Sequence, residues 1–170
     1  SLCGQLVIPD KVESIGVYSF NCCSELTGKL VIPNSITRIE MGSFCMLHKI
    51  TEIQFPVNSE CIGPFAFSYC YSLVGSLIIP NSVNCIDKFA FQNCSGLNGN
   101  LILPDSISTI GQFAFAKCKM LIGDLKIPKN LAVIEISTFE DCAKFTSLSI
   151  SENVVEIKEK AFCNCSGFAG

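Results

Sequence analysis

The sequence predicts a right-handed parallel β solenoid made of about seven short repeats. Two observations carry this prediction. A proline preceded by an apolar residue recurs every 23 or 24 residues, from Pro9 to Pro128. The segments 77–100 and 101–124 also match along their whole length, as LIIPNSVNCIDKFAFQNCSGLNGN and LILPDSISTIGQFAFAKCKMLIGD. A single repeat of this length cannot bury its own apolar side chains, so neighbouring repeats must stack into a shared core.

We interpret residues 1–170 as a single repeat domain and expect it to be a fragment of a longer array. The repeat length shortens to 23 residues at two places, 50–53 and 145–148. A site that tolerates a deletion is typical of a turn between packed elements. The repeats begin near residues 6, 30, 53, 77, 101, 125 and 148.

Each repeat should contain a first strand, a turn, a second short strand and a helical turn. In 73–79 every second residue should point inward, which indicates a strand. The Pro-Asn-Ser segment after it favours a turn, and 83–86 should return as a second extended stretch. Phe67, Cys70 and Leu73 then recur every three residues, which suggests a helical turn.

Stacked repeats place like residues above one another. The largest such ladder is phenylalanine, and directly before it runs a ladder of small residues that lets the coils approach closely. The phenylalanines are Phe20, Phe44, Phe67, Phe91, Phe115, Phe139 and Phe162.

The repeat resembles the BspA-like, Treponema pallidum-type leucine-rich repeat surface proteins. The family string I-G-x-x-A-F-x-x-C-x-x-L is present at 110–121, and the x-I-P-x-S-V string that follows it in the family is present at 78–83. Leu47 in place of Cys and Ser151 in place of Pro are local departures. The resemblance implies a leucine-rich repeat solenoid, an extracellular or cell-surface location, and a role as a protein-binding or adhesion module.

Composition and motifs argue against several other functions. The net charge of −3 gives no basic surface of the kind that binds nucleic acid. Every apolar run is too short to span a membrane. His48 is the one histidine, no C-x-x-C pair occurs, and no nucleophile or phosphate-binding motif is present. We therefore expect no catalytic residue, no metal site and no cofactor.

The cysteines are predicted to be mostly buried free thiols. Half of the twelve occupy one position of the repeat, where the second repeat has Leu47, so the position is apolar and suits a buried thiol. Cys61 and Cys85 follow the prolines of adjacent repeats at the same distance and should be neighbours. Two incidental thiols and a bridge between them both remain open.

The outward residues of the first strand are candidates for partner binding. Apolar side chains there would form a patch large enough to mark a protein interface, although β-propensity on a parallel sheet explains them equally well. The candidates are Val7, Val31, Val74, Ile78, Ile102 and Ile122.

Aromatic residues form a second candidate stripe, two positions before the phenylalanine ladder. Such stacked rings either bind a partner or seal neighbouring coils, and we favour sealing. The stripe contains Tyr18, Phe65, Phe89 and Phe113.

The expected function is therefore non-enzymatic protein binding, with a host or extracellular-matrix protein as partner. The alternative is a structural spacer within a larger surface protein whose other domains bind. Core residues exposed at either end, Leu2 or Phe168, should also favour end-to-end self-association.

Overall fold

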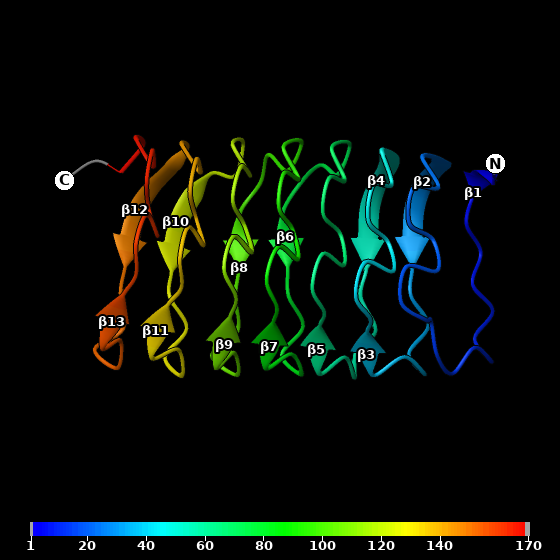
Figure 1. The fold of residues 1–170 in the computed structure, drawn as a ribbon, viewed down its shortest axis with the longest axis horizontal. Coiled ribbons are helices and arrows are strands. Elements are labelled where there is room, and N and C mark those ends of the chain that lie inside the picture. Colours follow the sequence, from blue (N-terminus) through cyan, green and yellow to red (C-terminus); the bar gives the residue numbers. More distant parts are fainter. Residues whose placement is uncertain (1, 169–170) are drawn as a thin grey trace.

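The computed structural model describes residues 2–168 and confirms the predicted solenoid of stacked parallel coils. Figure 1 shows the coils side by side, with the two chain ends at opposite ends of the stack. Each coil contributes one strand to a first row, and each coil after the first contributes, after the turn, a two-residue strand to a second row.

The first row of strands contains the L-x-I segments. The apolar side chains alternate, so that Leu30 and Leu77 are buried while Val31 and Ile78 are exposed. In six of the seven repeats a proline follows this segment and stops the ladder, because proline has no N–H to donate. The row consists of β1 (Cys3–Gln5), β2 (Glu25–Val31), β4 (Lys49–Gln54), β6 (Leu77–Ile78), β8 (Leu101–Ile102), β10 (Gly123–Lys126) and β12 (Phe145–Ser149).

The second row contains strands of two residues each. Their inward residues, such as Ile62 and Ile86, are fully buried. Four of these strands form one continuous parallel sheet in the order β3-β5-β7-β9, and β11 pairs with β13. The row consists of β3 (Arg38–Ile39), β5 (Cys61–Ile62), β7 (Cys85–Ile86), β9 (Thr109–Ile110), β11 (Val133–Ile134) and β13 (Glu156–Ile157).

Both 23-residue repeats are accommodated at the start of the first strand. The register between β2 and β4 shifts at Gly28/Lys29, and that between β10 and β12 shifts at Gly123/Asp124. Gly28 and Gly123 both have φ near +79°, a conformation that glycine adopts at little cost. The deletions therefore fall where the strand is already irregular.

The predicted helical turn is wrong: no helix occurs among residues 2–168. Phe65 and Tyr69 have positive φ, which a right-handed helix excludes. The segment instead alternates its hydrogen bonds. Ala66 N–H donates to Gly63 C=O within the coil, whereas Phe65 N–H donates to Lys88 C=O of the next coil. Bonds to the neighbouring coil thus replace those of a helix.

The core is one continuous column through the stack. Consecutive phenylalanine rings lie 5.3 to 5.7 Å apart between centroids, with nearly parallel planes. Phe67, Phe91 and Phe115 are buried at the centre of the stack, and the small residues before them, Ala66, Ala90 and Ala114, are fully buried. We call this side of the coil, from the small residue to the cysteine, the turn face.

Candidate functional site

The outward side of the first strand row, which we call the strand face, presents every apolar residue predicted there. Val7, Val31, Val74, Ile78, Ile102 and Ile122 are all exposed, from 38% for Val31 to 77% for Val7. Such an accumulation of exposed aliphatic side chains is unusual on one face of a soluble protein. Whether these residues bind a partner stays a prediction at this point.

The centre of the strand face is the pair of isoleucines on β6 and β8. Ile78 and Ile102 are register partners, with exposed fractions of 62% and 48%. The same position carries Gln54 in the preceding coil and Lys126 in the following coil, and both are exposed. The isoleucine pair is therefore an apolar centre with a polar side chain on each side.

The first strand row is divided into three separate sheets. They are β1-β2-β4, β6-β8 and β10-β12, so the central pair is hydrogen-bonded as a sheet to neither neighbour. Limited contacts remain at the breaks. Val74 N–H donates to Thr51 C=O at the first, and at the second Ile122 N–H donates to Gly99 C=O within an isolated parallel bridge between Asn100 and Ile122.

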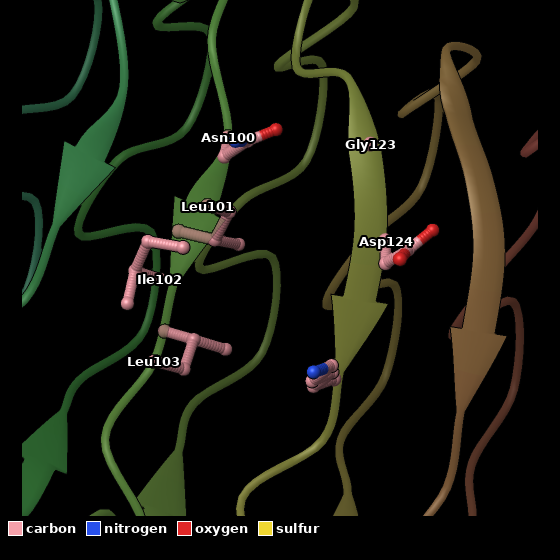
Figure 2. Close-up of a pocket in the computed structure, with 7 residues that line it drawn as sticks. Asn100, Leu101, Ile102, Leu103, Gly123 and Asp124 are labelled. Carbon is pink, nitrogen blue, oxygen red and sulfur yellow. The ribbon is translucent and has the colours of Figure 1, made fainter.

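An open hollow lies at each break. The larger, about 340 Å³, lies between β8 and β10, where Asn100, Ile102 and Asp124 are among the lining residues (Figure 2). The smaller, about 160 Å³, lies between β4 and β6 beside Glu52, Val74 and Ile78. The isoleucine pair thus has a side-chain-sized depression on both sides, each carrying one carboxylate.

The sequence contains a signal for these breaks that the pattern analysis missed. The last residue of L-x-I is isoleucine in five repeats, but Phe55 and Leu103 replace it in the repeats that precede the two breaks. Isoleucine is β-branched and favours the extended backbone of a strand more than leucine does. Phe55 is also large, and its ring packs edge-on against Phe67 and Phe91 of two coils.

The aromatic stripe lies on the turn side and is largely packed against itself. Phe65, Phe89 and Phe113 are half-buried, and their rings stack at 4.7 and 5.0 Å with interplanar angles of 8° and 5°. Tyr18 is 46% exposed, and its ring fills the space beside Gly42, where an added Cβ would lie 2.1 Å from Tyr18 Cε1. This arrangement favours the sealing role over partner binding.

The single histidine, the possible metal ligands and the apolar segments were also compared with the structure. The His48 ring lies 5.1 Å from the Tyr71 ring, tilted by 32°. Across residues 2–168, no group of three or more metal-ligating side chains comes together. No helix in this range is long and apolar enough to cross a membrane.

The repeated cysteine is buried, as predicted, but it is more than an apolar filler. The thiols of Cys94 and Cys118 donate to the carbonyls of Phe67 and Phe91, each in the preceding coil, at 3.2 Å. Burial raises the pKa of Cys118 to about 12, and it raises that of Cys94 well above its ordinary value. These thiols are therefore held protonated and hydrogen-bonded, which makes them unreactive.

Cys61 and Cys85 are neighbours, as predicted, and both are free thiols. They lie opposite each other on β5 and β7, outside the core column. Their environment differs from that of the core thiols because a charged residue, Arg38, is the register partner of Cys61 on the other side.

Comparison with known proteins gives a consistent result. A family model described as a BspA type leucine rich repeat region matches residues 2–75 and 62–168. A leucine-rich repeat protein from Bacteroides ovatus is 29% identical with a TM-score of 0.80; the match covers 88% of this chain and 38% of that protein. The T. pallidum leucine-rich repeat protein is 25% identical with a TM-score of 0.87, over 97% of this chain and 78% of that one. No curated protein matches the chain.

Proposed function

Because the chain belongs to the BspA-type leucine-rich repeat family, whose proteins are generally protein-interaction scaffolds, we propose that it is a non-enzymatic adhesion module. It acts at the cell surface, and the strand face binds a host or extracellular-matrix protein there. The chain spans less than two thirds of the B. ovatus protein, so this proposal concerns the repeat domain alone.

The observation that carries the proposal is the exposure of Ile78 and Ile102 on adjacent strands. At about 25 cal/mol per Å² of buried apolar surface, covering two isoleucine side chains contributes a few kcal/mol to binding. Exposure of these aliphatic side chains to water is unfavourable, and a partner that covers them removes this free-energy cost. Hot spots of protein interfaces are typically a small apolar centre within a polar rim.

The rigidity of the stack supports the same proposal. Each strand of the central pair is backed by buried leucines, Leu77 and Leu101, which are 4% and 3% exposed. A preformed surface loses little conformational entropy when it binds. The two hollows beside the pair would accept side chains of the partner. Their charges are balanced within the protein, because Glu52 pairs with Lys29 at 2.8 Å and Lys126 lines the larger hollow together with Asp124.

The test is binding to candidate host cells and matrix proteins by the purified domain and by the Ile78→Asp/Ile102→Asp variant. We expect the variant to lose binding by at least about tenfold, since two charges would be buried without partners. The matched control is Val57→Asp/Val155→Asp, which alters two exposed valines outside the strand face, 64% and 82% accessible.

Circular dichroism must show that both variants fold. Equal loss of binding by the control and the test variant would contradict the assignment to the strand face. Retention of full binding by a folded Ile78→Asp/Ile102→Asp variant would contradict it as well.

The spacer role remains the second candidate function. It is supported by the irregular distribution of apolar residues, since Lys126 and Ser149 interrupt the row in the last coils. A spacer would show no saturable binding to any surface, whereas its removal from the full-length protein would shorten the reach of the other domains.

Apolar residues at the N-terminal end of the described stack support end-to-end association of the isolated domain. Leu2 is 56% exposed, and an apolar hollow of about 380 Å³ beside Leu6 and Ile8 lies at this end of the described stack. Sedimentation of the isolated domain at rising concentration tests it: growth beyond a monomer is expected, and Leu6→Lys should suppress it.

A further inference from the structure

A row of outward-pointing side chains follows the corner of the stack at the repeated cysteine position. The cysteines themselves point into the core, and Cys94 and Cys118 are 0% exposed. The residues directly before and after this position are half-buried or exposed in every coil. The backbone holds them in register, because the N–H groups of Tyr69, Asn93 and Lys117 donate to carbonyls of the following coil at 2.8 Å. We call these two columns of side chains the corner row.

The corner row changes from aromatic to polar to basic along the stack. In the second to fifth coils its pairs are Met46 and His48, Tyr69 and Tyr71, Asn93 and Ser95, and Lys117 and Lys119. Neighbouring coils lie about 4.8 Å apart, so the tyrosine pair and the lysine pair are separated by about 10 Å. The amide and hydroxyl pair lies between them.

The aromatic end has one covered side and one open side. The Tyr71 ring is 40% exposed, and it lies 5.1 Å from the His48 ring of the preceding coil and 5.9 Å from the Tyr69 ring. On the other side, the following coil carries only Ser95 and Gly96 at the matching positions. An added Cβ at Gly96 would lie 2.2 Å from the Tyr71 carbonyl oxygen, so a larger residue does not fit there. Small residues therefore form a shelf between Tyr71 and the lysines.

The basic end of the row keeps its charge. Within residues 2–168, Lys117, Lys119 and the nearby Lys144 form no ion pair, although half of the cations do. All three lysines are exposed. The one acidic residue of the corner row, Asp141, accepts a hydrogen bond from Asn164 Nδ2 at 2.7 Å. The lysines outnumber this carboxylate, so the end of the row is positive on a chain whose net charge is −3.

We propose that the corner row binds an anionic glycan chain. A sugar ring packs on the open side of Tyr71, and its carboxylate or sulfate group lies against Lys117 and Lys119. Hydroxyl groups of the chain bond to Asn93 and Ser95 on the shelf. The corner row is separate from the strand face, so this binding does not depend on the function proposed for that face.

The chemistry of the row fits a sugar better than it fits an acidic peptide. A sugar ring has an apolar C–H face and a rim of hydroxyl groups, and a tyrosine ring offers an apolar face beside its own hydroxyl. No hydrogen bond within residues 2–168 engages the side chains of Asn93 or Ser95, so their amide and hydroxyl groups are available. An acidic peptide would pair with the lysines but would leave this polar shelf without partners.

The test is binding of the purified domain to immobilised hyaluronan, which carries carboxylates, and to chondroitin sulfate, which adds sulfates. Neutral dextran and poly-glutamate are the comparison surfaces. We expect saturable binding to at least one anionic glycan. It should weaken as salt rises from about 0.05 M to about 0.3 M, because salt screens exposed ionic contacts. The difference between the two glycans identifies the anionic group.

Two variants replace residues of the row with those of the polar coil between them, which the fold already accepts. They are Tyr69→Asn/Tyr71→Ser and Lys117→Asn/Lys119→Ser. Asparagine also suits positions 69 and 117, where φ is +62° and +65°. Each variant should weaken glycan binding by about tenfold.

The matched control is Lys11→Ser/Lys88→Gln. It removes two exposed lysines that lie outside the corner row, and it introduces the residues that the next coil carries at the same positions, Ser35 and Gln112. This variant should bind the glycan within about twofold of the wild type. Ile78→Asp/Ile102→Asp should also keep glycan binding, so failure of the strand-face proposal and failure of this one are distinguishable.

The wild-type surfaces decide the question even where a variant fails to fold. Binding to poly-glutamate or to dextran as strong as binding to the anionic glycans would overturn the proposal, as would no binding to either glycan. Wild-type affinity in either test variant, with circular dichroism showing that it is folded, would overturn it too. An equal loss of affinity in the Lys11→Ser/Lys88→Gln control would show that only overall charge is read, and would also count against the corner row.

Discussion

The turn face and the strand face of the same coils follow opposite rules. On the turn face each side chain contacts its own counterpart in the next coil, and the position hardly varies, as in the phenylalanine ladder. On the strand face the outward position changes from valine to glutamine, isoleucine, lysine and serine along the stack. The comparison shows that one face holds the repeats together, while the other is free to carry a pattern specific to this protein.

The difference arises from how much each position buries. Phe91 is fully buried between rings at 5.3 and 5.5 Å, whereas Ile102 on the adjacent coil keeps about half of its surface in water. Substitution on the turn face therefore changes the packing of three coils, and substitution on the strand face changes little except the surface itself.

The largest effect should come from the phenylalanine ladder. Phe91→Ala should lower the free energy of unfolding by about 3 to 5 kcal/mol, because it opens a cavity in the middle of the stack. Urea unfolding measures this. Phe162→Ala, at a half-buried ring in the last coil, should cost clearly less. An equal decrease in the free energy of unfolding for Phe91→Ala and Phe162→Ala would contradict the expectation that a phenylalanine at the centre of the stack stabilises the fold more than one in the last coil.

Because of the buried core thiols, the free energy of unfolding should fall at alkaline pH. Cys118 has a folded pKa of about 12, raised by burial from its ordinary value of 9.0. Between these values the unfolded chain loses the proton and the folded chain keeps it, so stability falls as pH rises above 9 and is unaffected below it. The slope is about 1.4 kcal/mol per pH unit for this thiol.

The matching measurement is urea unfolding at several pH values between about 8 and 11. Cys118→Ala should show the shallower decline, although it is less stable at neutral pH. Phe89→Ala, which is also destabilised but keeps every thiol, should decline as steeply as the wild type. Parallel curves for Cys118→Ala and the wild type would contradict the assignment.

The aromatic stripe should give an intermediate effect. Phe89→Ala removes two ring stacks, to Phe65 and Phe113, at about 0.5 to 1.5 kcal/mol each. We expect a loss of about 1 to 2 kcal/mol and unchanged partner binding. Loss of partner binding by a folded Phe89→Ala protein would show that the aromatic stripe takes part in binding.

The smallest effect on stability should be on the strand face. Ile102→Thr keeps a β-branched side chain at a position that is 48% exposed, and should change the free energy of unfolding by less than about 0.5 kcal/mol. The same substitution should weaken partner binding. A large loss of stability would show that the isoleucine pair is structural, and would favour the spacer role.

Most of the fold could be predicted from the sequence because the repeat multiplies each local signal. The coil length, the phenylalanine ladder, the outward placement of Ile78 and Ile102, and the closeness of Cys61 to Cys85 all follow from position in the repeat. Whether the outward residues bind a partner could not be predicted in the same way, because exposure and β-propensity give the same pattern.

By itself, the sequence determined which residues are stacked and which side of the coil they occupy. Only the tertiary structure decided how the backbone satisfies its hydrogen bonds. The spacing of Phe67, Cys70 and Leu73 predicts a helical turn, but the N–H groups of 65–70 alternate between their own coil and the next. The breaks beside β6 and β8 likewise depend on adjacent coils together. The physical reason is that a backbone N–H donates to whichever carbonyl the neighbouring coil brings within reach, and a pattern read along one coil does not contain that information.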